Sequence, residues 1–260
     1  MRGIRHPCRF PPLLPDAAVV AIFGPTGIGK TAVAIELAEL LRARGEDPVA
    51  ISADALQVYE GLETLTGAAD ADERTRLEHR LIGIVPVTEP FSVGDYMRLA
   101  HAEIDGALER GRRPIVVGGT GLYLRAALAD LSLEKAAPGE SSELWSSDVR
   151  HPTVLCGLVM ERGALYERID ARVDAIVAAG AAEEARAAER AGASRTARKA
   201  LGFEQLLAGD VEQLKRRTRN YARRQLTWMR KMAGVRTVDV TSRTPADVAR
   251  EIDRMLAAST

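Results

Sequence analysis

The clearest pattern in this sequence is a glycine-rich segment near its amino end. It consists of Gly24, Pro25, Thr26, Gly27, Ile28, Gly29, Lys30 and Thr31, and it satisfies each fixed position of the phosphate-binding pattern G-x-x-x-x-G-K-[ST]. An apolar, β-branched run that includes Val19, Val20 and Ile22 precedes it, and a helix-forming run at 32–41 follows. A strand, a loop and a helix in this order predict a phosphate loop.

A phosphate loop holds a diphosphate mainly with backbone N–H groups and the positive end of the following helix. Lys30 adds a full positive charge, and the Thr31 hydroxyl can reach a Mg²⁺ ion carried by the phosphates. The alternative is a glycine-rich turn without a ligand. The loop alone leaves open whether the bound phosphates are transferred or depart as a leaving group.

Composition limits the class of protein. A chain of 260 residues with 46% hydrophobic content can bury a full core, and we expect one main domain with a smaller lobe. Basic and acidic residues both total 36, so any nucleic-acid binding must rely on a local patch. We expect residues 1–16 to be a disordered lead-in rather than a signal peptide, and no run is long enough to span a membrane.

The two cysteines, Cys8 and Cys156, are far apart and lack the spacing of a metal site. They favour reduced thiols in a cytoplasmic protein.

Apolar runs and helical patterns alternate along the rest of the chain, which predicts an α/β fold with a parallel sheet, flanking helices and a helical C-terminal lobe. Besides the first strand, we expect strands at 48–53, 80–85, 114–117, 154–160 and 235–240. We expect helices opening at Ser92 and Thr244, each with an acid three residues later, and further helices at 165–177, 181–191, 197–207 and after Asp210.

Two strand ends carry candidate site residues. Asp54 follows the second strand, where open α/β sheets bind ligands, and it should face the phosphate loop. Gly118, Gly119 and Thr120 follow the fourth strand and would allow close approach of a ligand to the backbone. The alternatives are a helix N-cap for the aspartate and a plain tight turn for the glycines. Because the fourth strand ends without a carboxylate, nucleotide hydrolysis is disfavoured.

The helix predicted after Asp210 is strongly basic, and no acidic residue occurs between Gln213 and Met232. Its basic residues are Lys215, Arg216, Arg217, Arg219, Arg223, Arg224, Arg230 and Lys231. In a protein without net charge, such a helix indicates contact with a phosphate backbone. A solvated amphipathic helix is the alternative, and Arg168 and Arg172 on an earlier helix could likewise be surface charges.

Taken together, these residues resemble the tRNA dimethylallyltransferase (tRNA isopentenyltransferase) family. The resemblance rests on GPTGIGKT (24–31), ISADALQVYEGLETLTGA (51–68), HRLIGIVPVTEPFSVGDY (79–96), VGGTGLYLRAAL (117–128), LYERIDARVD (165–174), RKALGFEQLL (198–207) and ARRQLTW (222–228). These segments follow the family order from 19 to 240. The resemblance also implies a fold like that of P-loop nucleoside triphosphate hydrolases.

The family resemblance implies transfer of a dimethylallyl group from dimethylallyl diphosphate to N6 of the adenosine 3′ to the anticodon in tRNA. Asp54 and Thr120 would be catalytic, and the phosphate loop with Arg168 and Mg²⁺ would hold the leaving diphosphate. The flipped base would lie against Asp54, Ala55, Leu56 and Gln57, and Arg223 and Arg224 would contact the anticodon stem-loop. We expect a monomer without membrane partners.

The sequence departs from the family between Leu131 and Arg150, where most members carry a helical insertion domain of several dozen residues. We therefore divide the chain into a core at 17–131, a polar connector at 132–150 and a part at 151–260 that completes the core and adds the basic lobe. Alternatives are an adenylate isopentenyltransferase acting on free adenine nucleotide, a small-molecule kinase and a non-catalytic RNA-binding relative.

Overall fold

The computed structural model describes residues 18–132 and 146–258. The expected lead-in at 1–16 and most of the expected connector at 132–150 lie outside these ranges. Cys8 also lies outside them, whereas Cys156 is a buried free thiol.

The core is a six-stranded sheet in the order β3-β2-β4-β1-β5-β6. All neighbouring strands are parallel. The strands are β1 (Val19–Phe23), β2 (Pro48–Ser52), β3 (His79–Arg80), β4 (Arg113–Gly118), β5 (Thr153–Val159) and β6 (Arg236–Asp239). Because β1 lies between β4 and β5, the loop that follows it emerges at the middle of the sheet. This confirms the predicted α/β fold class.

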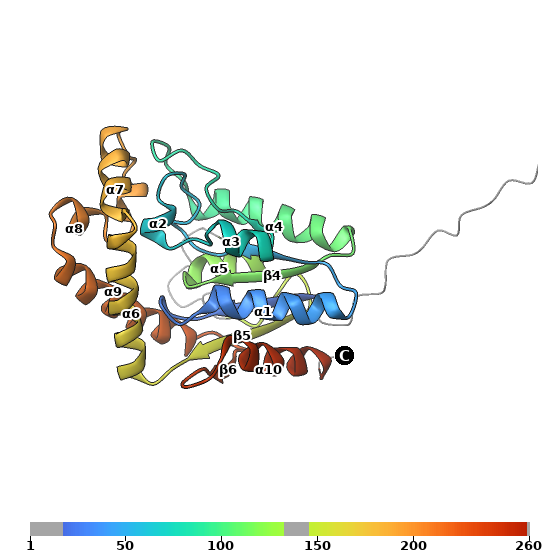
Figure 1. The fold of residues 1–260 in the computed structure, drawn as a ribbon. Coiled ribbons are helices and arrows are strands. Elements are labelled where there is room, and N and C mark those ends of the chain that lie inside the picture. Colours follow the sequence, from blue (N-terminus) through green and yellow to red (C-terminus); the bar gives the residue numbers. More distant parts are fainter. Residues whose placement is uncertain (1–17, 133–145, 259–260) are drawn as a thin grey trace, which may run out of the picture.

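Helices cover both faces of the sheet. In Figure 1, α1 (Lys30–Ala43) and α10 (Pro245–Ala257) lie side by side on one face, and α4 (Val93–Glu109) and α5 (Gly121–Leu128) cover the other. Each face buries its own apolar cluster. The predicted capping boxes at the starts of α4 and α10 are present, with Ser92 and Thr244 as the capping residues.

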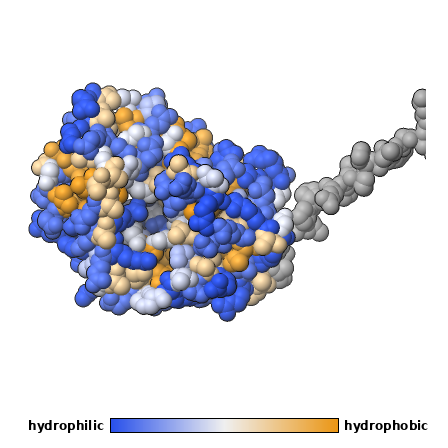
Figure 2. Space-filling view, in the orientation of Figure 1, coloured by the Kyte–Doolittle hydropathy of each residue, from blue (hydrophilic) through white to orange (hydrophobic). Residues whose placement is uncertain are grey.

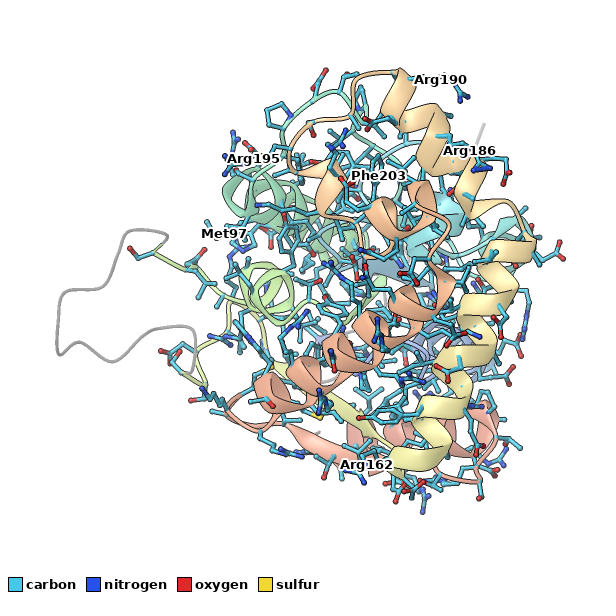
Figure 3. All side chains as sticks on the ribbon, turned by 90° about the vertical axis from the view of Figure 1, so that its left-hand side faces the viewer. Met97, Arg162, Arg186, Arg190, Arg195 and Phe203 are labelled. Atoms are coloured by element: carbon cyan, nitrogen blue, oxygen red, sulfur yellow. The ribbon has the colours of Figure 1, made fainter. Side chains whose placement is uncertain are left out.

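A helical lobe crosses the carboxyl end of the sheet and faces the viewer in Figure 3. It comprises α6 (Arg162–Ala178), α7 (Ala181–Arg190), a 3₁₀ turn (Ala197–Lys199), α8 (Phe203–Leu207) and α9 (Val211–Met229). The short helices α2 (Glu63–Thr66) and α3 (Ala71–Arg76) lie on the core side of this lobe (Figure 1). The lobe therefore closes over the loops that follow the strands.

Three predicted elements were wrong in extent. The strand expected at 80–85 ends at Arg80, because Leu81 and Gly83 adopt left-handed φ angles of 62° and 59° that turn the chain out of the sheet. The helix expected at 197–207 is broken by Gly202, whose φ is 104°. The long basic helix ends at Met229, before Met232.

The surface shown in Figure 2 is largely hydrophilic, with hydrophobic residues in scattered patches. None of the helices within 18–132 and 146–258 combines the length and apolar character needed to cross a membrane.

Candidate active site

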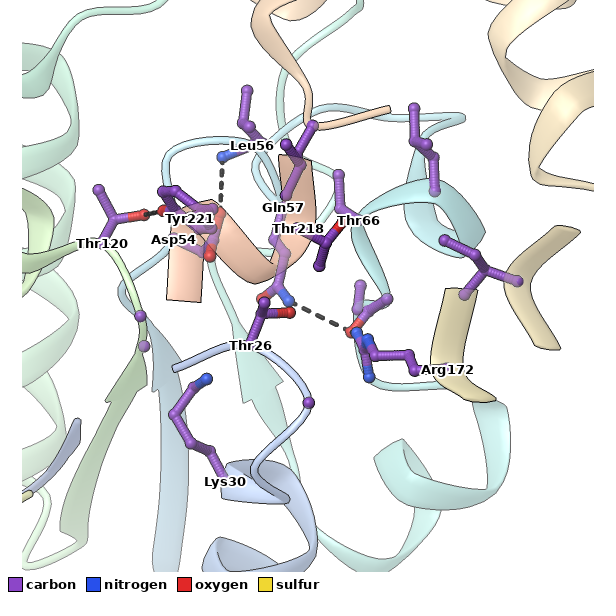
Figure 4. Close-up of a pocket in the computed structure, with 18 of the residues that line it drawn as sticks. Thr26, Lys30, Asp54, Leu56, Gln57, Thr66, Thr120, Arg172, Thr218 and Tyr221 are labelled. Carbon is purple, nitrogen blue, oxygen red and sulfur yellow. Dashed lines mark hydrogen bonds between the residues drawn. The ribbon is translucent and has the colours of Figure 1, made fainter. Parts of the chain in front are cut away.

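A cavity of about 570 Å³ lies between the phosphate loop and the helical lobe. Its wall combines the start of α1, the loops after β2 and β4, and side chains of α6 and α9. These segments are far apart in the sequence, and the sheet and the lobe bring them together (Figure 4).

The phosphate loop forms the floor of the cavity. Thr26, Gly27, Gly29, Lys30 and Thr31 line it, whereas the remaining residues of the predicted motif, Gly24, Pro25 and Ile28, are not part of the wall. Gly27 and Gly29 have φ angles of 80° and 97°, which L side chains rarely adopt. The chain therefore needs glycine at both positions to present its backbone to the cavity.

Lys30 is directed at its own loop. Its Nζ donates to the carbonyl oxygens of Gly24 and Pro25, each at 3.0 Å. Burial lowers the pKa of Lys30 to about 8, although nearby Asp54 opposes the shift. An anion in the cavity would restore the charged form of the amine.

Asp54 lies in the cavity wall at the end of β2. Its Oδ1 accepts a hydrogen bond from the Leu56 backbone N–H at 3.0 Å. Burial raises the pKa of Asp54, while this hydrogen bond and the Lys30 charge act in the opposite direction. The N-cap alternative is wrong, because turns follow Asp54 and the next helix begins at Glu63. The carboxylate is thus available to a ligand.

The loop that follows Asp54 continues the wall with Ala55, Leu56 and Gln57. The Gln57 side chain accepts a hydrogen bond from Ser52 Oγ at 2.8 Å and donates one to the Gly67 carbonyl at 3.4 Å. These bonds fix the loop between β2 and α2. The residues predicted to bind the base therefore line the same cavity as Asp54.

Gly118, the last residue of β4, and Gly119 both line the cavity, and both also pack closely against other parts of the protein. A Cβ on Gly118 would lie 2.1 Å from the Ala53 carbonyl oxygen, and one on Gly119 would lie 2.3 Å from Gln225 Nε2. The two glycines therefore allow close approach to the protein's own chain and also present their backbone to the cavity. Thr120 follows in the cavity wall, with its Oγ1 3.3 Å from Tyr221 Oη on α9 (Figure 4).

Arg168 and Arg172 of α6 take different positions. Arg172 lines the cavity and donates from Nη2 to the Gly67 carbonyl at 3.1 Å. Arg168 is not part of the wall and donates from Nη1 to the carbonyl of Ile28 in the phosphate loop at 3.4 Å. Sequence reasoning selected Arg168, but the side chain that enters the cavity belongs to Arg172, one helical turn further along.

The basic helix α9 contributes to the site unevenly. Arg224 lines the cavity and stacks over the Tyr221 ring, with its Cζ 5.5 Å from the ring centroid. Arg223 is exposed and is not part of the wall. Lys215 pairs with Asp174 of α6 at 2.7 Å, and Arg219 pairs with Asp170 at 2.6 Å. Acids on α6 therefore neutralise part of the charge that the sequence displays on this helix.

Sequence reasoning also missed several residues of the wall. It gave Thr218, Tyr221 and Gln225 of α9 no role in the site, yet all three line the cavity. A glutamine at helical spacing from Leu214, Thr218 and Tyr221 was the available signal, because a buried amide requires hydrogen-bond partners. Lys199 and Arg217 add further positive charge to the wall.

No group of three or more His, Cys, Asp and Glu side chains that could bind a metal ion occurs among the described residues. The Thr31 hydroxyl lies in the cavity wall at the start of α1. A phosphate-borne Mg²⁺ needs few protein ligands, because water and phosphate oxygens complete its coordination. The residues present therefore fit an ion that arrives with a diphosphate.

The fold and the cavity define a P-loop α/β protein in which a half-buried carboxylate and a phosphate loop share one cavity. Comparison with known families agrees with this geometry. The IPP transferase family matches residues 57–150 and 139–232, and the isopentenyl transferase family matches residues 17–85.

Individual relatives extend over most of the chain. A tRNA dimethylallyltransferase of Geobacillus kaustophilus is 33% identical over 290 residues, covering 86% of this chain and 90% of the relative. The crystal structure of a tRNA isopentenylpyrophosphate transferase from Bacillus halodurans superposes with a TM-score of 0.81 at 30% identity, covering 94% of this chain and 96% of the other. A tRNA isopentenylpyrophosphate transferase from Staphylococcus epidermidis gives a TM-score of 0.77 at 25% identity, with 92% and 99% coverage. The chain belongs to the tRNA dimethylallyltransferase family.

The matches also bear on the length of the connector. The alignment with the Geobacillus kaustophilus relative runs over 290 positions, more than the 260 residues of this chain. The two segments that match the IPP transferase family overlap at 139–150, within the expected connector.

Proposed function

We propose that this protein transfers a dimethylallyl group from dimethylallyl diphosphate to N6 of the adenosine 3′ to the anticodon in tRNA. The observation that carries the proposal is the placement of Asp54 and the phosphate loop in one cavity. A leaving diphosphate and an acceptor amine can therefore meet there. Membership in a family of tRNA dimethylallyltransferases supports the same reaction.

In the proposed reaction, the N6 nitrogen attacks C1 of the dimethylallyl group. The bond between C1 and the diphosphate oxygen breaks, and the departing diphosphate takes its electron pair. Asp54 accepts the proton that N6 loses, and a raised pKa makes this carboxylate a better base near neutral pH. Because an exocyclic amine is a poor nucleophile, alignment of the two reactants supplies much of the rate.

The leaving diphosphate lies on the phosphate loop in this proposal. Backbone N–H groups of residues 27–31 and the N-terminus of α1 stabilise the charge that develops as the bond breaks. Lys30 turns from its loop carbonyls to the diphosphate, and Arg172 and Arg168 add positive charge from α6. Thr120 lies opposite, where its hydroxyl can contact the diphosphate or the reacting centre.

Mg²⁺ is part of the proposal because Thr31 fits an ion that accompanies the diphosphate. Bound there, the ion would neutralise charge on the phosphate oxygens. The Thr31 hydroxyl would be its protein ligand.

The acceptor adenosine must leave its stack to reach Asp54, and the free-energy cost of unstacking a base is small in an anticodon loop. Ala55, Leu56 and Gln57 then line the base, and Arg224 lies at the cavity for the adjoining phosphates. Arg223, exposed one residue earlier on α9, contacts the backbone further along. The proposed RNA surface is therefore α9 and the lobe around it.

We propose that this lobe binds the anticodon stem-loop without an insertion domain. The length of the alignment with the relative and the overlap of the two family segments support a connector at 132–150 that is shorter than in the relative. In this division, residues 17–131 form the core, and residues 151–260 complete it and add the RNA-binding lobe. The protein would act as a monomer in the cytoplasm, where its tRNA substrate occurs.

The proposal is tested in cells by expressing this chain in a strain that lacks the modification and analysing its tRNA nucleosides by mass spectrometry. Dimethylallyl-adenosine should reappear, and the Asp54→Ala variant should not restore it. Restoration by the variant, or none by the wild type at equal expression, would contradict the proposal.

A further inference from the structure

The side chain of Gln225 connects the two loops that form opposite sides of the proposed diphosphate site. Its Oε1 accepts a hydrogen bond from the Thr26 backbone N–H at 2.9 Å, and its Nε2 donates to the Gly119 carbonyl at 2.7 Å. The two partners lie 199 and 106 residues away in the sequence. Gln225 itself belongs to α9, so one residue of the helical lobe holds both loops of the core.

The surroundings of this amide leave little freedom. Gln225 is 4% exposed, and Gly119 approaches it so closely that a Cβ there would lie 2.3 Å from Nε2. A buried amide that fills both of its hydrogen-bonding roles is strongly oriented, because losing either partner would leave a polar atom unsatisfied. The distance between the phosphate loop and the Thr120 loop is therefore set by α9.

We infer that Gln225 is a positioning residue for the leaving diphosphate. It keeps the phosphate loop and the loop of Thr120 at the separation at which both contact the same diphosphate. This inference rests on the proposed function for the identity of the ligand. It assigns Gln225 no contact with the base or with the reacting carbon.

Two variants of similar size to glutamine remove one or both of these hydrogen bonds. Gln225→Glu still accepts from Thr26, but its carboxylate cannot donate to the Gly119 carbonyl, and two oxygens then face each other. Gln225→Leu has similar size and loses both bonds. We expect Gln225→Glu to raise the Kd for inorganic pyrophosphate with Mg²⁺, measured by calorimetry, about tenfold, the effect of one buried hydrogen bond, and Gln225→Leu to raise it at least as much. In turnover, the KM for dimethylallyl diphosphate should rise more than the KM for RNA.

Protonation offers a rescue that only the Gln225→Glu variant can show. Once protonated, the introduced carboxyl group again carries a donor and an acceptor, so lowering the pH should bring the Kd of this variant towards that of the wild type at the same pH. The titratable groups around the amide are Lys30 of α1, Asp54 after β2 and Tyr221 of α9. Because the wild type and the variants share these groups, the ratio of the variant Kd to the wild-type Kd at each pH reports the effect of position 225 alone. For Gln225→Leu, this ratio should not change with pH.

Gln205 provides the matched control. It is another buried glutamine of the lobe, 6% exposed, and its side chain donates to Gln213 at 3.0 Å. Gln205→Leu should lower Tm to a similar degree and leave pyrophosphate binding unchanged. A purely structural role for Gln225 would instead lower Tm and the active fraction with an unchanged Kd, and that result would overturn the inference.

The pyrophosphate measurement also separates this inference from the proposed function. If the wild type binds pyrophosphate and position 225 behaves as expected but no dimethylallyl group is transferred, the proposed function fails and the role of Gln225 stands. If transfer occurs and both variants bind pyrophosphate as the wild type does, only the role of Gln225 fails.

Discussion

The hydroxyl of Tyr221 lies 3.3 Å from that of Thr120, although the two residues belong to different parts of the molecule. Thr120 is the residue before the first turn of α5 in the core, and Tyr221 belongs to α9 in the lobe. Burial raises the pKa of Tyr221 to about 12, so its hydroxyl stays protonated and can donate. The basic helix proposed to bind RNA thus also completes the wall around the reacting groups.

Replacing the proposed base should separate turnover from binding. Asp54→Asn keeps an oxygen for the Leu56 N–H but cannot accept the proton from N6. We expect kcat to fall ~10²- to 10⁴-fold, as for loss of a general base, with the Kd for pyrophosphate nearly unchanged. Single-turnover kinetics with dimethylallyl diphosphate and an anticodon stem-loop measure this. A variant within a few-fold of wild-type kcat would remove Asp54 from the mechanism.

The same substitution should stabilise the protein. Because burial raises the pKa of Asp54 above its unfolded value, ionising the carboxyl is less favourable in the folded state. The native state therefore loses stability as the pH rises from the unfolded pKa through the folded pKa. At neutral pH we expect Asp54→Asn to have the higher Tm, with the difference shrinking as the pH falls below the folded pKa. An equal or lower Tm for the variant at neutral pH would contradict the assigned shift.

The phosphate-loop lysine predicts a limit at alkaline pH. With a pKa of about 8 in the protein without ligand, Lys30 loses its charge as the pH rises past that value. We expect kcat/KM for dimethylallyl diphosphate to decline above pH 8, since this ratio reports ionisations of the free enzyme. Lys30→Arg retains its charge, so the decline should vanish from its profile even if its rates are lower. The same decline in both proteins would assign it to another group.

Charges on α9 should differ in their effect on RNA. Arg223 is exposed, whereas Lys215 is paired with Asp174 of α6 at 2.7 Å. Arg223→Ala should weaken binding of the anticodon stem-loop and reduce the slope of log K against log salt by about 1. Lys215→Ala should leave the slope unchanged. Fluorescence anisotropy at several salt concentrations tests both, and equal slopes for the two variants would argue against this RNA surface.

Local patterns in the sequence predicted the parts of the fold that depend on local physics. The phosphate loop, the capping boxes at Ser92 and Thr244 and the parallel strands all follow from spacing and residue type. The strand expected at 80–85 was predicted too long, because Leu81 adopts a left-handed φ that non-glycine residues rarely show. Leu81 and Val85 of the apolar run pack in the core outside the sheet, whereas Ile84 is exposed.

The candidate site was harder to predict where it depends on distant segments. Asp54 could be placed because it follows a strand, and strand ends share one edge of the sheet. Whether Arg168 or Arg172 faces the cavity depends on the rotation of α6 about its axis relative to the core. The residue pattern of α6 alone does not specify this rotation. Gln225 could not be assigned a role from the sequence, because its partners, Thr26 and Gly119, are identified only by the tertiary structure.

The most direct test of the account combines the purified chain with dimethylallyl diphosphate and Mg²⁺ and offers two acceptors together, an anticodon stem-loop and AMP. Mass analysis of both acceptors then shows where the dimethylallyl group goes. We predict that the stem-loop adenosine gains one dimethylallyl group while pyrophosphate is released and AMP remains unmodified. Product on AMP alone, or phosphate transfer from ATP with no use of the allylic diphosphate, would contradict the account.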